Sequence, residues 1–169
     1  HAQIARLMIE VSAATTSEGA FEIATQIERV GDDVPASDRV PFVIALLAAA
    51  RGARTAAAVG RALQLLESAR ALVVPSWWTA HYELTFDLHL LQCECLIAGA
   101  MIDEAETSID ALLLRAGRPL DTAAVHRLKA MVLTVRSDYV KAIEAALEGL
   151  NLLGVVLERR PVAADYDTA

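Results

Sequence analysis

The sequence predicts an all-α protein of about eight helices in antiparallel pairs, without a sheet. Of its 169 residues, 55% are hydrophobic and only 5% are aromatic, and alanine and leucine supply most of the apolar residues. These residues favour helices, whereas strands are rich in β-branched and aromatic residues. Apolar positions recur three, four and seven residues apart, which is the period of a helix with one buried face. Short connections then make neighbouring helices antiparallel.

Residues that start or stop helices bound these segments. Ser37 is placed to cap one helix, and Pro41 falls in the first turn expected for it. Asp121 and Ser137 are placed as caps of two later helices, and Gly154 suits the position just after a helix end. The helices are expected over about 1–14, 18–31, 37–52, 57–73, 79–98, 102–116, 122–136 and 138–153.

An internal repeat groups the helices in pairs. The second helix of each pair carries a small residue near its start, and small or apolar residues four and seven positions later. These triplets are Ala20/Ala24/Ile27, Ala62/Leu66/Ala69, Ala105/Ile109/Leu112 and Ala142/Ala146/Gly149. Their first members are 42, 43 and 37 residues apart. We therefore expect one helical-repeat domain over residues 1–157, with a tail or linker over 158–169. Its pairs are expected at about 1–33, 37–74, 76–117 and 119–154.

This pattern resembles the tetratricopeptide repeat, a helix–turn–helix unit of about 34 residues. Ala105 and Ala142 match its small mid-repeat position, and Tyr139 matches the aromatic position before that alanine. The first-helix positions that usually hold Trp, Gly and Tyr differ. They hold His89, Cys93 and Leu96 in one repeat and His126, Ala130 and Leu133 in the next. The resemblance implies a degenerate tetratricopeptide-like α-α superhelix with insertions between its pairs.

A wider resemblance covers about residues 1–157 and is strongest over 78–154. It rests on Trp78-x3-Tyr82-Glu83-Leu84-Thr85, Leu88-His89-Leu90, Glu104-Ala105-Glu106, Leu112-Leu113, Pro119-Leu120-Asp121 and the run from Gly149 to Gly154. The chain is similar there to a helical-repeat region of large bacterial signalling proteins. Those proteins join a serine/threonine-kinase-like domain, an AAA-type ATPase, helical repeats, a GAF sensor and often a histidine kinase. A related region occurs in ATPase-containing transcription activators.

Charge and hydropathy exclude two classes of partner. The formal net charge is −7 and the cationic residues are spread out, so the sequence does not favour nucleic-acid binding, which needs clustered Lys and Arg. Arg51 and Arg54 break the longest apolar run well before the ~20 residues that a membrane-spanning helix needs. With no signal peptide in view, we expect a cytoplasmic protein without a membrane partner. Because it begins at His1 rather than Met, we expect a fragment of a longer protein.

No motif in the sequence predicts catalysis. The phosphate-binding Gly-x4-Gly-Lys-Ser/Thr loop is missing, as are the kinase glycine-rich loop and catalytic-loop signature. Asp103, Glu104 and Glu106 could form an acid/base cluster, but they open a helix, where acidic side chains interact favourably with the helix dipole. We therefore expect no catalytic residue and no cofactor, and any ATPase or kinase chemistry would belong to other domains of the parent protein.

His89 and Cys93 lie four residues apart on one helical face and could share a metal ion. A zinc site needs three or four protein ligands; His81 lies two turns away, and no fourth ligand is obvious. We therefore expect both side chains to pack inside a helix pair, and no metal site. Cys93 and Cys95 point in nearly opposite directions on a helix and cannot bridge each other. We expect both to be reduced, buried thiols.

The concave side of the expected array is the candidate interaction face. In tetratricopeptide-like arrays the first helix of each pair lines this side. The repeat register places eleven residues there: Ile44, Leu47, Arg51, Arg54, Asp87, Leu90, Glu94, Ile97, Arg127, Met131 and Thr134. Six of them are the candidate interaction residues: Arg51, Arg54, Asp87, Glu94, Arg127 and Met131. The lysine and asparagine clamp of chaperone-binding members is missing, so this mixed face is expected to dock a domain or to remain solvated. Trp77 and Trp78 are the only tryptophans, and we expect at least one ring to be buried.

The sequence therefore favours a non-enzymatic helical-repeat segment of a bacterial signal-transduction or regulatory protein. Its expected partners are proteins, either neighbouring domains of the parent chain or a second copy of itself. The last helix supports this expectation, because Leu147, Leu150 and Leu153 leave its outer flank apolar. An alternative is a repeat domain of a transcription regulator that senses a ligand or peptide in its groove. A compact helical enzyme is a further alternative, but it would need a convergent cluster of ionisable groups.

Overall fold

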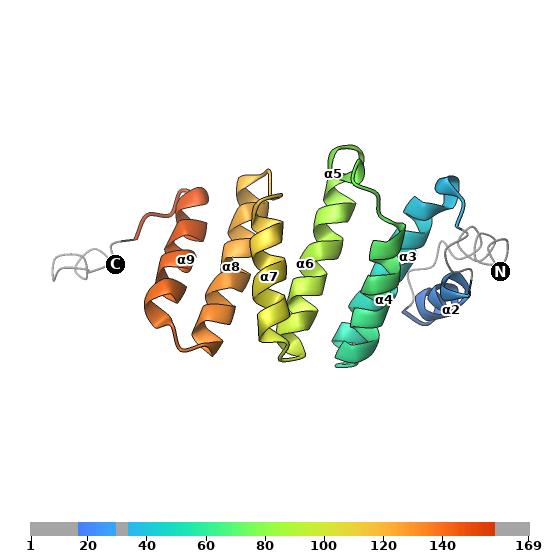
Figure 1. Ribbon diagram of the computed structural model, residues 1–169, viewed down its shortest axis with the longest axis horizontal. Helices are drawn as coiled ribbons and strands as arrows, with labels where there is room; N and C mark the ends of the chain where they lie inside the picture. The colour runs from blue at the N-terminus through green and yellow to red at the C-terminus, as the bar shows by residue number, and fades with distance from the viewer. Residues whose placement is uncertain (1–16, 30–33, 158–169) are drawn as a thin grey trace. The chain divides into compact units, whose positions relative to one another are not determined.

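The computed structural model describes residues 17–29 and 34–157, and within these ranges it contains helices and no strand (Figure 1). The helix expected over 1–14 lies outside the described residues. The described helices are α2 (Ser17–Glu28), α3 (Ala36–Thr55), α4 (Val59–Leu72), α5 (Trp77–Ala80), α6 (Tyr82–Ala98), α7 (Ile102–Leu113), α8 (Pro119–Val135) and α9 (Tyr139–Leu152). The predicted all-α class is confirmed for this part of the chain.

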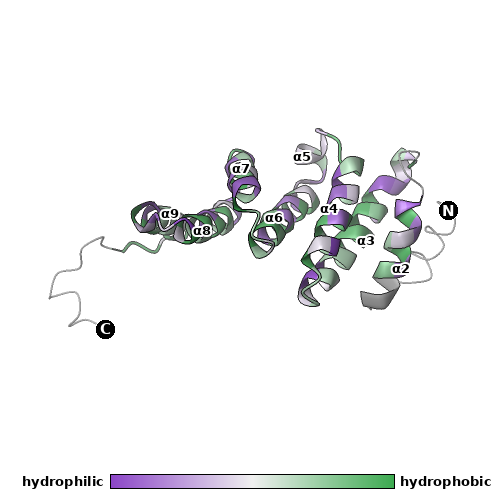
Figure 2. Ribbon diagram, turned by 60° about the horizontal axis from the view of Figure 1, so that its bottom comes forward, coloured by the Kyte–Doolittle hydropathy of each residue, from purple (hydrophilic) through white to green (hydrophobic). Residues whose placement is uncertain are grey.

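The chain divides into two compact units, residues 1–108 and 109–169. The division falls within α7, at none of the expected boundaries between helix pairs. The expected single domain over 1–157 stays a prediction. Each helix carries both hydrophobic and hydrophilic residues, as the colours of Figure 2 show. The buried residues of each unit are mostly apolar, although some large apolar side chains, such as Ile44 and Ile143, stay exposed.

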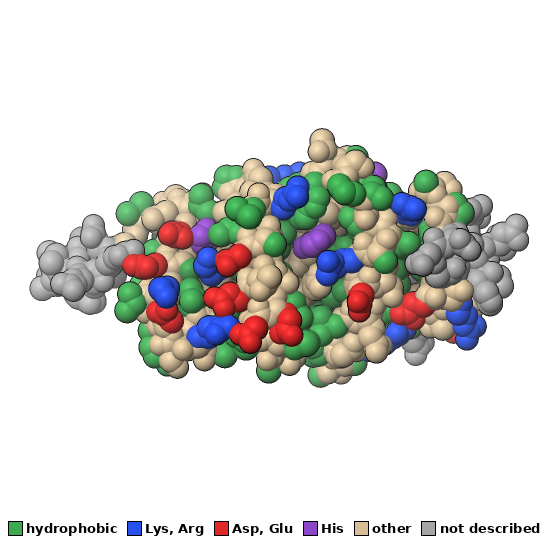
Figure 3. Space-filling view, in the orientation of Figure 1, with side chains coloured by type: hydrophobic (Ala, Val, Ile, Leu, Met, Phe, Trp, Pro, Cys, Tyr) green, Lys and Arg blue, Asp and Glu red, His purple; other side chains and the backbone are tan. Residues whose placement is uncertain are grey.

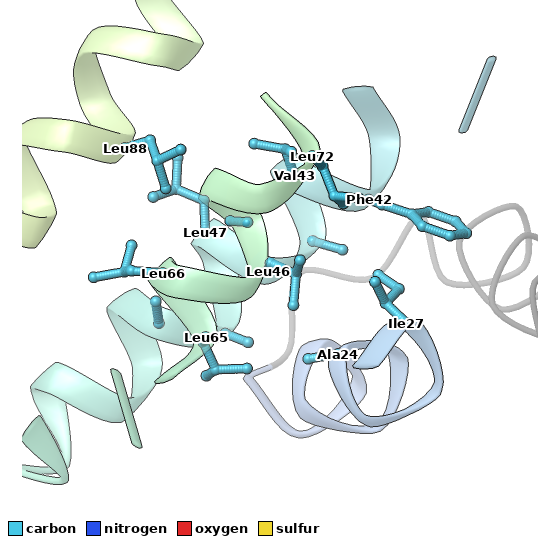
Figure 4. Close-up of a cluster of buried hydrophobic side chains, with 14 of the residues drawn as sticks. Ala24, Ile27, Phe42, Val43, Leu46, Leu47, Leu65, Leu66, Leu72 and Leu88 are labelled. Atoms are coloured by element: carbon cyan, nitrogen blue, oxygen red, sulfur yellow. The ribbon is translucent and has the colours of Figure 1, made fainter. Parts of the chain in front are cut away.

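The first unit is built around α3 and α4, which lie side by side with α2 packed on α3 and α6 packed on α4. A three-residue connection joins α3 to α4 and makes them antiparallel. Large side chains such as Phe42, Leu46 and Leu66 are fully buried in this core (Figure 4). Small residues on both helices, including Ala49 and Ala62, are also fully buried, and small side chains let two helix backbones approach closely.

The second unit contains α8 and α9, which pack against each other along their length. Here α8 supplies Val125, Leu128 and Val132, whereas α9 supplies only small residues, Ala142, Ala145 and Gly149. Two alanines expected at close approaches between helices are buried: Ala142 here and Ala105 in α7 of the first unit.

Three expected helix starts are wrong. The third helix begins at Ala36, directly after Pro35, so Ser37 lies inside it, where its hydroxyl bonds the Asp38 carboxylate at 3.1 Å. Pro41 therefore falls in the second turn. Helix α8 begins at Pro119, because proline already has the φ of a first helical residue; Asp121 lies in its first turn and is not the cap.

The third wrong start is that of α9, where Asp138 replaces Ser137 as the cap and accepts a hydrogen bond from the Lys141 backbone N–H at 3.3 Å. Ser137 instead adopts a positive φ of 61°. At the other end of α9, Gly154 has a φ of +79°, as predicted for the residue after a helix end.

The helix expected over 79–98 is preceded by a separate turn. Helices α5 and α6 are separated at His81, which has a φ of −136° and a ψ of 47°. Trp77 opens α5 and is 7% exposed within the core of the first unit, and its ring meets the His81 ring edge-on at 5.0 Å between centroids. The prediction that at least one tryptophan is buried is confirmed. The burial of Trp77 anchors the short helix α5 to the core of the first unit.

Candidate interaction face

Four of the six candidate residues form two ion pairs between α3 and α6. The Arg51 Nη2 atom donates to the Asp87 Oδ2 atom at 2.7 Å, and Arg54 pairs with Glu94. Arg51 precedes Arg54 in α3, and its partner Asp87 likewise precedes Glu94 in α6. Helices α3 and α6 therefore run parallel, with these charges along the side they share.

The local sequence explains why these charges lie on one side of each helix. Arg51 and Arg54 are three residues apart and Asp87 and Glu94 are seven apart, and both spacings return to the same helical face. Ile44 lies two turns before Arg51 on that face and is 53% exposed. The face thus combines neutralised charges with an exposed apolar side chain.

These ion pairs stabilise the fold only weakly. Arg51 and Asp87 are both about half exposed, and the Arg54–Glu94 pair is partly exposed. Exposed pairs contribute roughly 0.2–1 kcal/mol each, because water screens them and holding two long side chains costs entropy. They therefore add little to the packing of α3 against α6.

The other two candidates, Arg127 and Met131, lie in the second unit. Both belong to α8, one turn apart, and the Arg127 Nη1 atom lies 3.6 Å from the Met131 sulfur. Met131 is 43% exposed. On the face drawn in Figure 3, basic and acidic side chains are intermixed.

The histidine and cysteines of α6 are packing residues. The Nδ1 atom of His89 lies 2.7 Å from the Thr85 carbonyl oxygen, and the Trp78 ring lies 5.0 Å away between centroids. Burial lowers the pKa of His89. Burial also raises the pKa of Cys93 to about 12 and raises that of Cys95. Both thiols are free and buried, as predicted, and neutral thiols are poor nucleophiles and ligands.

The described ranges hold no cluster of metal-ligand side chains. They contain no group of three or more His, Cys, Asp or Glu side chains that could hold a metal ion. Asp103 and Glu104 are exposed in the first turn of α7, as predicted, and Glu106 is half-buried. In these ranges, no helix is both long enough and apolar enough to cross a bilayer.

Sequence reasoning missed several long-range contacts. Arg61 of α4 binds Glu28 of α2 through both of its terminal nitrogens, at 2.7 and 3.0 Å. Lys129 of α8 binds Asp110 of α7 at 2.9 Å. No local pattern signals such pairs, because their partners are separated by 33 and 19 residues. Sequence reasoning placed Leu147, Leu150 and Leu153 on an apolar outer flank of α9 but missed the exposed Tyr139 and Ile143. Their four-residue spacing could have indicated them.

Comparisons with known proteins supply no relative. No protein family, no curated protein and no solved structure matches the chain significantly.

Proposed function

We propose that this chain is a non-enzymatic helical-repeat segment that mediates protein interactions in a bacterial signal-transduction or regulatory protein. The observation that carries the proposal is the face shared by α3 and α6. There the Arg51–Asp87 and Arg54–Glu94 pairs are exposed beside Ile44. Such a face offers apolar contact area together with charges that select an orientation, which is how charged groups act at protein interfaces.

The arrangement of the first unit supports a tetratricopeptide-like architecture. Helix α4 lies antiparallel to α3, α6 packs on α4, and the two ion pairs run between the parallel helices α3 and α6. Stacked helix pairs produce this set of neighbours, since each new pair contacts only the one before it. The resemblance of residues 78–154 to the repeat region of multidomain signalling proteins points to the same class.

In this proposal the chain transmits signals by docking rather than by chemistry. Its partner is a neighbouring domain of the parent protein, such as an ATPase, sensor or kinase domain, in the cytoplasm. A net charge of −7 disfavours nucleic acid as a partner. Docking replaces the exposed intramolecular ion pairs with intermolecular ones, so the state of one domain changes the packing surface available to another.

A charge swap tests the proposal. The double variant Arg51→Asp with Asp87→Arg keeps an ion pair between α3 and α6 but reverses its direction. It should fold normally and lose affinity for the domains encoded on either side of the chain in its gene, measured by calorimetric titration. A matched control, Lys129→Asp with Asp110→Lys, swaps an exposed pair between α7 and α8 and should bind as the wild type does. Equal binding by the charge-swap variant and the wild type would refute a role for this face.

A further inference from the structure

Helix α9 has a second apolar face besides the one that packs on α8. Its small residues Ala142, Ala145 and Gly149 face α8 and are buried. Its large apolar residues lie on another side, at spacings of four, seven and three positions: Tyr139, Ile143, Leu150 and Leu153. Tyr139, Ile143 and Leu153 are 60%, 58% and 49% exposed. We call these four residues the outer face of α9.

The same chain contains a covered counterpart of this face. Ala142 and Gly149 stand 80 residues after Ala62 and Ala69 of α4, which are also buried small residues of a second helix. The same shift of 80 residues relates the outer face of α9 to four residues in or directly after α4. These are Val59, Leu63, Arg70 and Val73.

In the first unit, α6 covers this counterpart. Val59, Leu63 and Val73 are only partly exposed and pack on a core that includes Leu88 and Leu91 of α6. A Cβ placed on Gly99, just after α6, would lie 3.4 Å from the Val59 side chain. At the other end of α4, Arg70 lies close enough to His89 for its charge to act on that ring. These contacts make α6 antiparallel to α4.

We propose that the outer face of α9 docks an amphipathic helix of a partner polypeptide, antiparallel to α9, in the way that α6 covers α4. This deepens the proposed function and rests on it, because it names a second surface and the kind of partner that fits it. The partner helix carries apolar residues with the same spacing as Leu84, Leu88, Leu91 and Cys95 of α6.

Two differences between α9 and α4 define the partner further. Leu150 stands where α4 has Arg70, so the partner has an apolar residue where α6 has His89. Ala146 is exposed where α4 has the fully buried Leu66, so the partner has room there for a larger side chain. A lipid surface fits less well, because the polar side of α9 carries Glu144 and Glu148 against one Lys141, and amphipathic helices that bind membranes are rich in basic residues.

A synthetic helix provides the test. The 17-residue peptide has the sequence of α6, Tyr82–Ala98, with Cys93→Ala and Cys95→Ala to remove thiols and His89→Leu to match Leu150. A control peptide also carries Leu88→Glu and Leu91→Glu. The fluorescently labelled peptides are titrated with the full chain and followed by anisotropy. We expect saturable binding of the first peptide and none of the control.

Matched variants locate the binding site. Ile143→Glu should raise the Kd by roughly tenfold or more, because docking would bury a charge in an apolar contact. Leu120→Glu introduces the same charge at an exposed leucine of α8, which is 68% exposed, and should change the Kd by less than about twofold. Circular dichroism and thermal unfolding should show that both variants stay folded.

Four outcomes would overturn this inference. The first two are the absence of peptide binding and peptide binding that Ile143→Glu leaves unchanged. The third is a wild-type dimer that Ile143→Glu converts to a monomer, which would make a second copy the occupant. The fourth is binding of the chain to phosphatidylglycerol vesicles that Ile143→Glu abolishes. If the charge-swap variant kept its affinity for the neighbouring domains, only the proposed role of the α3–α6 face would be contradicted. Ile143 and the swapped residues lie on different helices, so the two tests are independent.

Discussion

Gly149 of α9 lies so close to His126 of α8 that a Cβ on the glycine would stand 3.1 Å from the histidine Cβ. This contact brings the two helix backbones together and also brings the His126 Nδ1 atom within 3.4 Å of the Glu148 carboxylate. Glycine is otherwise unfavourable inside a helix, by roughly 0.5–1 kcal/mol relative to alanine. Glycine suits this position because α8 leaves too little space for a larger side chain.

Replacing this glycine should separate the two helices. We expect Gly149→Leu to lower the free energy of unfolding by roughly 1–3 kcal/mol, because the added side chain must displace α8. Gly60→Leu is the matched control, since no other described atom, apart from its chain neighbours and its own helix backbone, lies within 4 Å of its added Cβ. Urea unfolding should show the control to be at least as stable as the wild type. Equal stability of both variants would contradict the close packing.

The small residue Ala142 should also resist enlargement. Ala142 is 7% exposed against α8, and we expect Ala142→Leu to cost roughly 1–3 kcal/mol of stability through overpacking. Ala105→Leu should behave similarly, because Ala105 is fully buried. Ala146→Leu, one turn later on an exposed side of α9, serves as control. A melting temperature that falls equally for Ala142→Leu and Ala146→Leu would argue against this account.

A charge should destabilise the chain more at Leu63 of α4 than at its counterpart in α9, Ile143. Leu63 packs partly against the core under α6, whereas Ile143 is 58% exposed. Leu63→Glu should therefore destabilise the chain by about 1–3 kcal/mol, and Ile143→Glu by about 0.5 kcal/mol or less. Chemical unfolding of the two variants measures the difference. A strongly destabilised Ile143→Glu variant would mean that the outer face of α9 is covered within the chain itself.

The cap of α9 should make stability depend on pH. The Lys141 ammonium group, 2.7 Å from Asp138, and the Lys141 backbone N–H lower the pKa of Asp138. A carboxyl whose folded pKa is lowered stabilises the fold above its unfolded pKa of about 3.9 and loses that effect as the pH falls through the folded pKa. The stability advantage of the wild type over Asp138→Asn should be constant above about pH 5 and shrink in stronger acid. Thermal unfolding from pH 7 to pH 2 would reveal a constant difference if this is wrong.

The thiols should be unreactive in the folded chain. Burial raises the pKa of both Cys93 and Cys95, and only the thiolate reacts quickly with disulfide reagents. We expect slow labelling by dithiobis(nitrobenzoate) at pH 8 and rapid labelling of both thiols in urea. Fast labelling of the native chain would show that this part of α6 opens easily.

Periodicity and helix-end residues determined most of the secondary structure. The helix expected over 57–73 is found at Val59–Leu72, and that expected over 138–153 is found at Tyr139–Leu152. The starts were less predictable, because Pro119 and Asp138 compete with Asp121 and Ser137 as helix-start residues within two positions. Such alternatives differ by about 1 kcal/mol, so packing of the helix body decides between them.

Periodicity alone predicts that the chain is helical, and it places Arg51 with Arg54, and Asp87 with Glu94, on one side of their helices. Only the tertiary structure decided that Arg51 meets Asp87 across 36 positions and that α4 is covered whereas the outer face of α9 is exposed. The reason is physical. A helical period is set by neighbours within two turns, but the partner of a charge or an apolar face is whichever distant segment the packing brings beside it.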